Sequence, residues 1–287
     1  MDNYSPRALI DKFMGFLKSQ NKSVFTIIAY KKDLEQFSGY LASQEKNDVR
    51  DVKKEDVAGF INKLLNDNYT KKSASRKLNS ARTFFRYLKN EGVVDQNPSL
   101  EVPHPKYSQA APRILSKLEY RALRDFAKED ARTYALIEIL LQTGVKIGEI
   151  ANIQLEDVKD QTLIVRPYGK NPAREIPLNK AGKKAIEDYL KQRTGAKNCQ
   201  ALFITRNGRP ILVRNIRQII NRCFREVEID NATVNDLRNT FIVHQLVNGA
   251  SIEYIAKIVG HRRLSSTERF INMIKQEVIK KDKLGEL

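Results

Sequence analysis

The sequence predicts a mainly α-helical protein with a small β-sheet, organised as two domains joined by a linker. Apolar residues recur at helical spacing through the first hundred residues. Four prolines then fall within a stretch of the chain that cannot continue as a helix. Beyond them, helical patterns are interrupted by two short strand-like runs around a hairpin signal. We therefore expect domains at residues 1–95 and 115–287, with a linker at 96–114.

Four helices are expected in the first domain. Ser5 and Pro6 are typical of an N-cap followed by proline at the first helical position, and Gly92 supplies a stop after the fourth helix. The apolar residues expected to face the core are, helix by helix, Leu9, Ile10, Phe13, Met14 and Leu17; Phe25, Ile28, Leu34, Phe37 and Leu41; Val57, Phe60, Ile61, Leu64 and Leu65; and Leu78, Ala81, Phe84, Phe85 and Leu88.

The second domain reads as mixed α and β. A capping box at Ser116–Glu119 opens its first helix, and Gly144 separates two later ones. The expected helices of this domain are at 117–128, 132–143, directly after Gly144, at 180–193, at 213–227 and from 235 to about 274. The expected strands are at 162–165, 174–177 and 202–205.

The charge balance points to a polyanionic partner. The chain has 51 Lys and Arg against 34 Asp and Glu, a formal net charge of +17. Such an excess attracts polyanions. Binding to nucleic acid is favoured by many Lys and Arg side chains because each phosphate that they neutralise releases counterions. A lysine-rich proteome is the alternative explanation.

Several classes of protein are disfavoured. Cys199 and Cys223 have no metal-site spacing, and only three histidines are present, so we expect neither a metal nor a cofactor. No signal peptide and no apolar run of membrane-spanning length is visible. We therefore expect a cytoplasmic, DNA-associated protein with no membrane partner.

Five short phrases follow one another in the second domain: Thr143–Ile150, Gly169–Asn171, Asn235–Phe241, Val259–His261 and Leu264–Phe270. In order and spacing they resemble the motifs of the tyrosine recombinases, the phage integrase and Xer-type family. The resemblance extends to the first domain, including Asn97 and Pro98 before the linker. It implies a helical, SAM-like core-binding domain followed by an α+β catalytic-type domain.

The resemblance assigns family positions to six residues, which are Lys146, Lys170, Asn235, Arg238, His261 and Phe270. In that family a tyrosine attacks a DNA phosphodiester, two arginines clamp its oxygens, a histidine handles protons, and the hairpin lysine protonates the leaving oxygen. Lys170, Arg238 and His261 keep the family's residue types. Arg238 paired with Glu149 or Asp236, or His261 packed at a helix start, would be structural alternatives.

The other three positions depart from the family pattern. Phe270 stands where the tyrosine belongs and has no nucleophilic atom, and the last tyrosine of the chain is Tyr254. Lys146 replaces an arginine and loses its bidentate fork. Asn235 replaces a histidine and carries no proton near neutral pH.

These substitutions predict a DNA-binding protein of this family, inactive or impaired in cleavage, that acts on duplex DNA as an accessory, regulatory or architectural factor. The expected DNA contacts, or else solvated charged faces, are Lys71, Lys72, Arg76, Arg82 and Arg86 in the first domain and Arg206, Arg209, Arg214 and Arg217 in the second.

Two alternatives stay open. The chain is an active site-specific recombinase if Phe270 is a trapping mutation, if Ser265, Ser266 or Thr267 serves as nucleophile, or if a partner protomer donates a tyrosine. It is an interaction module if the tail at 271–287 docks on a second copy or on an active recombinase. The other reading of this tail is a helix packed on its own domain.

Overall fold

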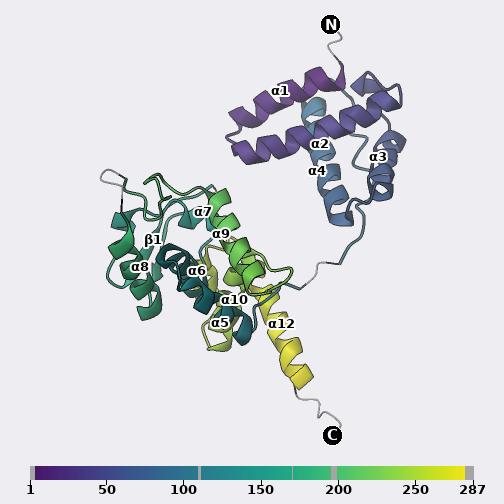
Figure 1. Ribbon diagram of the computed structural model, residues 1–287. Coiled ribbons are helices and arrows are strands. Elements are labelled where there is room, and N and C mark those ends of the chain that lie inside the picture. Colours follow the sequence, from purple (N-terminus) through teal and green to yellow (C-terminus); the bar gives the residue numbers. More distant parts are fainter. Residues whose placement is uncertain (1–3, 109–110, 170, 195–198, 282–287) are drawn as a thin grey trace. The chain divides into compact units, whose positions relative to one another are not determined.

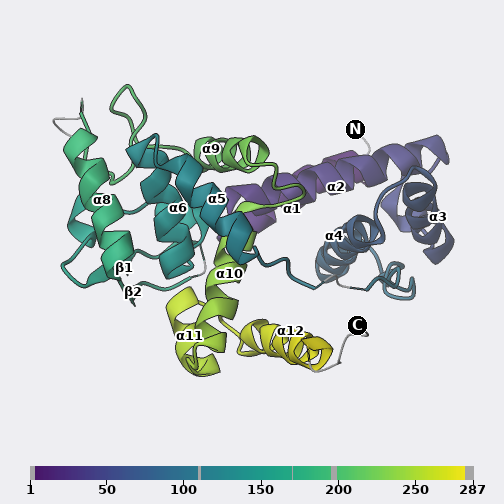
Figure 2. The same ribbon diagram turned by 60° about the horizontal axis from the view of Figure 1, so that its bottom comes forward.

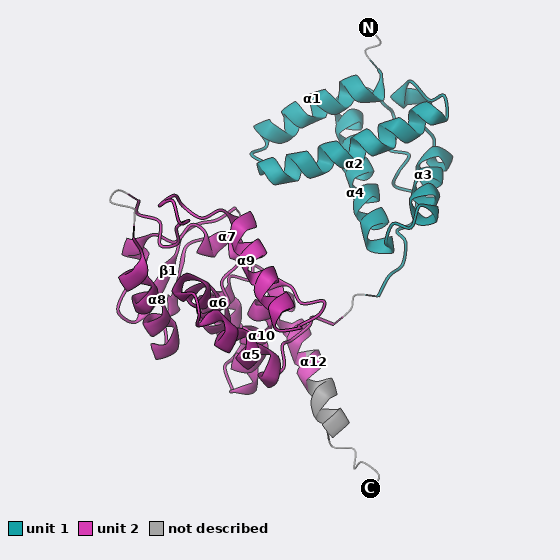
Figure 3. Cartoon of the chain, in the orientation of Figure 1, with its two compact units in different colours: residues 1–109 teal, residues 110–287 magenta. Residues whose placement is uncertain are grey.

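The computed structural model describes residues 4–108, 111–169, 171–194 and 199–281. They form two compact units, Met1–Gln109 and Ala110–Leu287 (Figures 1 and 3). The division falls inside the stretch where the prolines predicted a linker. The expected fold class, mainly helical with one small sheet, is confirmed.

Unit 1 is a helical domain around an aromatic and aliphatic core. Ser5 caps the first helix by accepting a hydrogen bond from the backbone N–H of Ala8, and Gly92 adopts a positive φ of 70° just beyond the last helix, as predicted. Its elements are α1 (Pro6–Ser19), α2 (Val24–Ser43), a short 3-10 turn (Val49–Asp51), α3 (Lys54–Asn66) and α4 (Lys71–Asn90).

The predicted core face of α2 is wrong at its start. Leu34, Phe37 and Leu41 are buried, but Phe25 is 78% exposed and Ile28 is 46% exposed. At about 100° of rotation per residue, Phe25 and Ile28 lie on the side of the helix opposite the other three. One helix face cannot bury both sets, and the core takes the later one.

The first part of the predicted linker packs on unit 1. The guanidinium of Arg82 donates hydrogen bonds to the carbonyls of Ser99 (3.1 Å), Leu100 (3.3 Å) and Val102 (2.6 Å). It also lies 2.7 Å from Nε2 of His104. One side chain of α4 therefore holds this segment against the helix.

Unit 2 surrounds a larger core with helices and a two-stranded sheet. Strands β1 (Thr162–Val165) and β2 (Arg174–Pro177) pair antiparallel, with Thr162 opposite Pro177. Its helical elements are α5 (Lys117–Ala127), α6 (Ala131–Thr143), α7 (Ile147–Ile150), a 3-10 turn (Leu155–Asp157), α8 (Lys180–Gln192), α9 (Val213–Glu226), α10 (Val234–Val247), α11 (Ile252–Val259) and α12 (Ser265–Lys281).

The short strand predicted at 202–205 is absent from the described structure. Ala201 and Ile204 make only isolated bridges, to Gln154 and Pro210. The segment is apolar and buried, which gives it the sequence pattern of a strand. However, no neighbouring strand runs far enough beside it to form a ladder.

The helical stretch predicted from 235 onward is three helices, α10, α11 and α12, which pack on one another (Figure 2). Gly249 and Gly260 have positive φ values of 89° and 68° at the two breaks. Within the described part of the chain, none of the helices has both the length and the apolar character to cross a bilayer.

Candidate active site and nucleic-acid interface

Arg238 connects the end of α6 to the end of α11. It lies on α10 with only 6% of its surface exposed. Its guanidinium donates hydrogen bonds to the carbonyls of Gly144 and Val259, the latter at 2.6 Å. These carbonyls precede Lys146 and His261 by two residues each. Burial lowers the pKa of Arg238 to about 10, so the group keeps its positive charge at neutral pH.

Lys146 lies half-buried at the N-cap of α7. Its backbone N–H donates to Glu149 (2.9 Å), and its Nζ donates to Oδ1 of Asn171 in the hairpin (2.9 Å). Burial lowers the pKa of Lys146, and the positive charge of Arg238 lowers it further. The lysine thus ties the hairpin to the start of α7 and brings a second cation beside Arg238.

Glu149 and Arg174 form a buried, bidentate ion pair. Two nitrogens of Arg174 reach the carboxylate at 3.0 and 2.7 Å, and its Nε donates to the carbonyl of Ile258 (2.6 Å). Burial alone raises the pKa of Glu149, but the hydrogen bonds from Arg174 and Lys146 lower it below its usual value. The carboxylate is therefore occupied by Arg174 rather than by Arg238.

His261 follows α11 and is fixed by a buried hydroxyl. Its Nδ1 lies 2.8 Å from Oγ1 of Thr267, which is fully buried. Burial lowers the pKa of His261 to about 4, with help from the positive charges of Arg238 and Lys146. The imidazole is therefore neutral at physiological pH and can accept or donate a single hydrogen bond at its other nitrogen.

Phe270 is part of the core of unit 2. Its side chain is 0% exposed, and the guanidinium carbon of Arg269 lies 4.8 Å from its ring centroid. Cation–π contact and apolar packing both stabilise this position. The residue at which the sequence resemblance places the tyrosine is therefore an integral part of the packing.

The remaining two positions are Asn235 and Lys170. Asn235 is exposed in the first turn of α10, three residues before Arg238 and so on the same side of the helix. Lys170 lies outside the described residues.

The charges of Lys146 and Arg238 both act on His261, so these three predicted residues lie in one neighbourhood. The structural roles of Asn171, Arg174 and Thr267 were not predicted. One feature of the sequence, the position of Glu149, could have indicated that a cation such as Arg174 is buried here. Glu149 falls among apolar residues, and a buried carboxylate requires a cation or several hydrogen-bond donors.

The predicted DNA contacts of unit 1 follow one side of α4, opposite its apolar face. Lys71, Lys72 and Arg86 are exposed. Arg76 is 53% exposed and pairs with the buried Asp33. Arg82 is held by the chain's own residues, as described above.

The predicted contacts of unit 2 are all exposed. Arg206 and Arg209 lie in the loop before α9, and Arg214 and Arg217 lie in its first turns. Because Arg214 and Arg217 are three residues apart on α9, they lie on the same side of that helix.

Comparison with known proteins decides the family. Residues 112–277, more than half of the chain, match the family described as Phage integrase family. The chain is a member of this family, the tyrosine recombinases. Residues 10–92 also match the description "Phage integrase, N-terminal SAM-like domain".

Relatives of this tyrosine recombinase match it along nearly its whole length. The tyrosine recombinase XerC of Oceanobacillus iheyensis is 30% identical over 285 residues, covering 94% of this chain and 92% of the relative. The XerC of Listeria welshimeri is 30% identical over 284 residues, covering 94% of each.

Solved structures share the fold at lower identity. A lambda integrase dimer bound to a COC′ core site superposes with a TM-score of 0.77 at 16% identity, covering 91% of this chain and 96% of the other. The Tn1549 transposon integrase in complex with a circular intermediate DNA gives 0.76 at 19% identity, covering 96% and 99%.

Proposed function

We propose that this tyrosine recombinase homologue binds duplex DNA and holds a backbone phosphate at Lys146, Arg238 and His261 without cutting the strand efficiently. It then serves as an accessory, regulatory or architectural factor. The observation that carries the proposal is Phe270, a fully buried phenyl ring at the family's nucleophile position.

Binding and cleavage make different demands on this site. Two cations and a neutral imidazole suffice to hold a phosphate, because phosphate recognition rests on charge and hydrogen-bond donors. Covalent cleavage also needs an attacking oxygen, which Phe270 lacks. Losing one transition-state donor costs about 10²–10³ in rate, and Lys146 lacks the fork of an arginine.

The charge distribution supports binding to duplex DNA. The net charge is +17, and exposed cations line α4 in unit 1 and the start of α9 in unit 2. The DNA complexes of lambda integrase and of the Tn1549 integrase, which share the fold, support the same class of ligand. Affinity is expected to fall steeply with salt as counterions are released.

A cleavage assay on DNA chosen by the protein tests the proposal. The protein first selects duplexes from a random pool, and the selected site is then made with a nick beside each phosphate in turn. Four proteins are compared: wild type, Phe270→Tyr, the triple variant Phe270→Tyr/Lys146→Arg/Asn235→His, and Arg238→Ala as a negative control.

We expect salt-sensitive binding by wild type, no denaturation-resistant adduct from it, and an adduct from the triple variant that exceeds any from Phe270→Tyr alone. An adduct formed by wild type would overturn the proposed loss of cleavage. A wild type that binds no duplex at low salt would overturn the whole proposal.

The second candidate is an active site-specific recombinase that integrates or recombines DNA. The whole-length similarity to proteins named tyrosine recombinase XerC favours it. Among the hydroxyl nucleophiles near Phe270, Thr267 is buried and hydrogen-bonded to His261, which leaves Ser265 and Ser266. If Phe270 is a trapping substitution, Phe270→Tyr alone restores nicking.

Donation of a tyrosine by a partner is tested by mixing. The chain is incubated with an isotope-labelled XerC and nicked DNA, and the phosphotyrosine is located by mass spectrometry. A labelled adduct at the half-site bound by this chain supports a role inside an active assembly.

The tail at 271–287 is the proposed contact to such a partner or to a second copy. Ile274 already packs against the core of its own unit, so only the later part of the segment is left for exchange. Sedimentation of the full chain and of a chain ending at residue 276, each with DNA, tests this. Equal assembly by both would exclude the tail as the contact.

A further inference from the structure

A polar hollow of about 320 Å³ lies in unit 2 among the start of α6, the end of α8 and the segment 204–206. Its lining is dominated by hydrogen-bonding side chains, which are Asp130, Arg132, Tyr189, Gln192, Thr194, Thr205 and Arg206. The volume exceeds the roughly 30 Å³ share of a single water, and none of these residues belongs to the site around Arg238.

Arg132 is incompletely satisfied at this hollow. One terminal nitrogen donates to the carbonyl of Ile204 (3.1 Å), but Nε is buried without a hydrogen-bond partner. It is the one buried side-chain nitrogen or oxygen in this condition among the residues the structure describes. Arg193 nearby shows the contrast, because its guanidinium donates to three backbone carbonyls. Arg132 lines the hollow with a guanidinium that the protein itself uses for a single hydrogen bond, and it is this under-used cation that makes the hollow a candidate anion site.

The other groups of the hollow are donors as well. Arg206 adds an exposed guanidinium, and Thr194 and Thr205 add hydroxyls. The hydroxyl oxygen of Tyr189 accepts from the backbone N–H of Ile204 (3.1 Å), so its hydrogen is left to donate. This set of donors matches an oxyanion with several oxygens.

One carboxylate, that of Asp130, also lines the hollow and is outnumbered there by two guanidinium groups. It caps α6 by accepting from the backbone N–H of Thr133 (2.7 Å). Burial alone raises the pKa of Asp130, but the Thr133 hydrogen bonds and the charges of Arg132 and Arg206 lower it. Both arginines therefore act at this hollow, and one carboxylate leaves a net positive charge.

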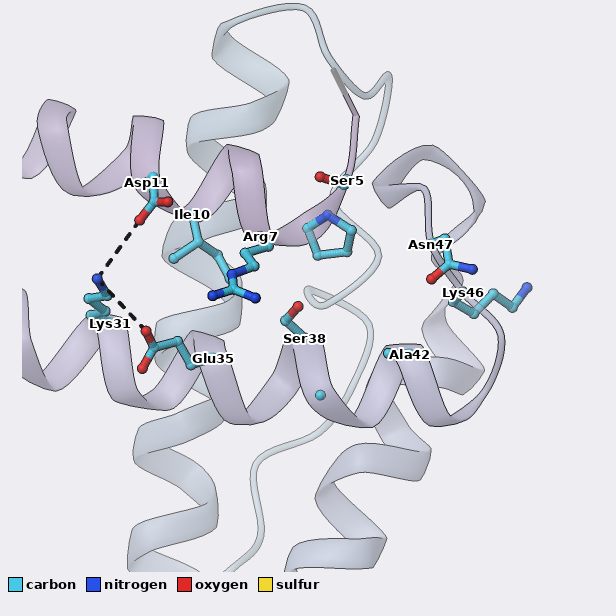
Figure 4. A pocket seen from close by; sticks show the side chains of 12 residues that line it. Ser5, Arg7, Ile10, Asp11, Lys31, Glu35, Ser38, Ala42, Lys46 and Asn47 are labelled. Atoms are coloured by element: carbon cyan, nitrogen blue, oxygen red, sulfur yellow. Dashed lines mark ion pairs between the residues drawn. The ribbon is translucent and has the colours of Figure 1, made fainter. Parts of the chain in front are cut away.

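A larger hollow in unit 1 has more acidic side chains in its lining. It lies between α1 and α2, and Figure 4 shows the ammonium group of Lys31 shared between Asp11 (3.9 Å) and Glu35 (3.8 Å). Two carboxylates, Asp11 and Glu35, thus lie among the cations of this hollow, against one carboxylate in the hollow of unit 2.

We infer that the hollow around Arg132 and Arg206 is a second phosphate-binding site, distinct from the one at Arg238. Its ligand is a phosphate group, from free phosphate or from the DNA backbone away from the phosphate at Arg238. The DNA source rests on the proposed function, whereas the site for free phosphate does not.

The first arm of the test uses inorganic phosphate and the full chain. Binding is measured by calorimetry at constant ionic strength, for wild type, Arg132→Gln, Arg206→Gln and the control Lys183→Gln. Lys183 is a surface cation of α8 outside the hollow, paired with Asp160. Arg238→Ala removes the other phosphate site.

We expect phosphate to bind Arg238→Ala and Lys183→Gln, and to bind about 10- to 100-fold more weakly to either hollow variant in the Arg238→Ala background, as the loss of one charged hydrogen bond requires. Arg206→Gln keeps the test valid if Arg132→Gln fails to fold, because Arg206 is exposed. Equal phosphate affinity of Lys183→Gln and Arg206→Gln, both in the Arg238→Ala background, overturns a site for free phosphate.

The second arm measures the salt dependence of duplex binding. If a DNA phosphate occupies the hollow, Arg206→Gln lowers the slope of log K against log salt by about 0.9, whereas Lys183→Gln leaves it unchanged. An unchanged slope with weakened phosphate binding assigns the site to free phosphate. No change in either arm overturns the inference, and a wild type that binds phosphate but no duplex overturns only the proposed function.

Discussion

Oγ1 of Thr267 lies 2.8 Å from Nδ1 of His261, and this contact joins the first turn of α12 to the loop after α11. The hydroxyl is fully buried. A hydroxyl can donate to Nδ1 or accept from it, so this contact fixes the orientation of the His261 ring whichever nitrogen carries the proton. This makes Thr267 a positioning residue of the site.

The substitution Thr267→Val should release the His261 ring. We expect the Nδ1 resonance of His261 to shift in nitrogen–proton NMR spectra of the variant, with stability lowered by about 1–3 kcal/mol, because Nδ1 loses its hydrogen-bond partner. Ser265→Ala, an exposed change in the same helix turn, serves as the control. A variant with the wild-type Nδ1 resonance would contradict the assignment.

The stability of the protein should fall as the pH is lowered from 7 to 5, partly because of His261. Its pKa is about 4 when folded and about 6.5 when unfolded, so the unfolded chain binds the proton first. The stabilisation is present above pH 6.5 and is lost as the pH falls towards 4. Urea unfolding at both pH values should show a loss smaller by about 1–2 kcal/mol in His261→Gln than in wild type. The exposed His244→Gln should match wild type.

The substitution Phe270→Tyr should destabilise the protein in the absence of DNA. The ring is fully buried in the core, so the added hydroxyl must be desolvated. We expect a loss of about 1–3 kcal/mol in the free energy of unfolding, measured by urea denaturation. Unchanged stability would show that the hydroxyl reaches a partner or water, as a working nucleophile would.

The carboxylate of Asp33 should be essential to unit 1. It is 2% exposed and accepts from Arg76, from Lys77 (2.9 Å) and from Ser80 (2.8 Å). Asp33→Asn leaves the buried ammonium of Lys77 without its counter-charge, so we expect a loss of about 3–5 kcal/mol by thermal and urea unfolding. Asp11→Asn, which removes an exposed partner of Lys31, should cost less than about 1 kcal/mol.

The substitution Arg82→Gln should free the segment after α4. Its guanidinium binds Ser99, Leu100, Val102 and His104 in the native chain. We expect faster limited proteolysis between residues 97 and 106, assayed without DNA so that any DNA contact is irrelevant. Arg86→Gln, an exposed change one turn later, should be cut at the wild-type rate. Equal rates for both variants would show that Arg82 does not restrain the segment.

Much of the molecule follows from local sequence. Strands β1 and β2 and most helix ends match the periodicity and capping signals, because those signals act over a few residues. The loss of chemistry at Phe270 also follows from sequence alone, since a phenyl ring offers no nucleophile in any fold. Phe25 and Ile28 were expected in the core, but the rotation of the chain about the helix axis places them on the opposite side of α2 from its buried residues.

The pairings between distant residues were decided only by the tertiary structure. Nothing local indicates that Glu149 pairs with Arg174, that Arg82 holds the linker, or that Arg132 leaves a nitrogen unpaired. With 51 Lys and Arg residues, the sequence offers many cations for each buried carboxylate or carbonyl. Which one is used depends on the loops that the packed helices bring together. The sequence therefore determined which chemical groups the site holds and lacks, and tertiary packing decided which of its cations are committed to the fold.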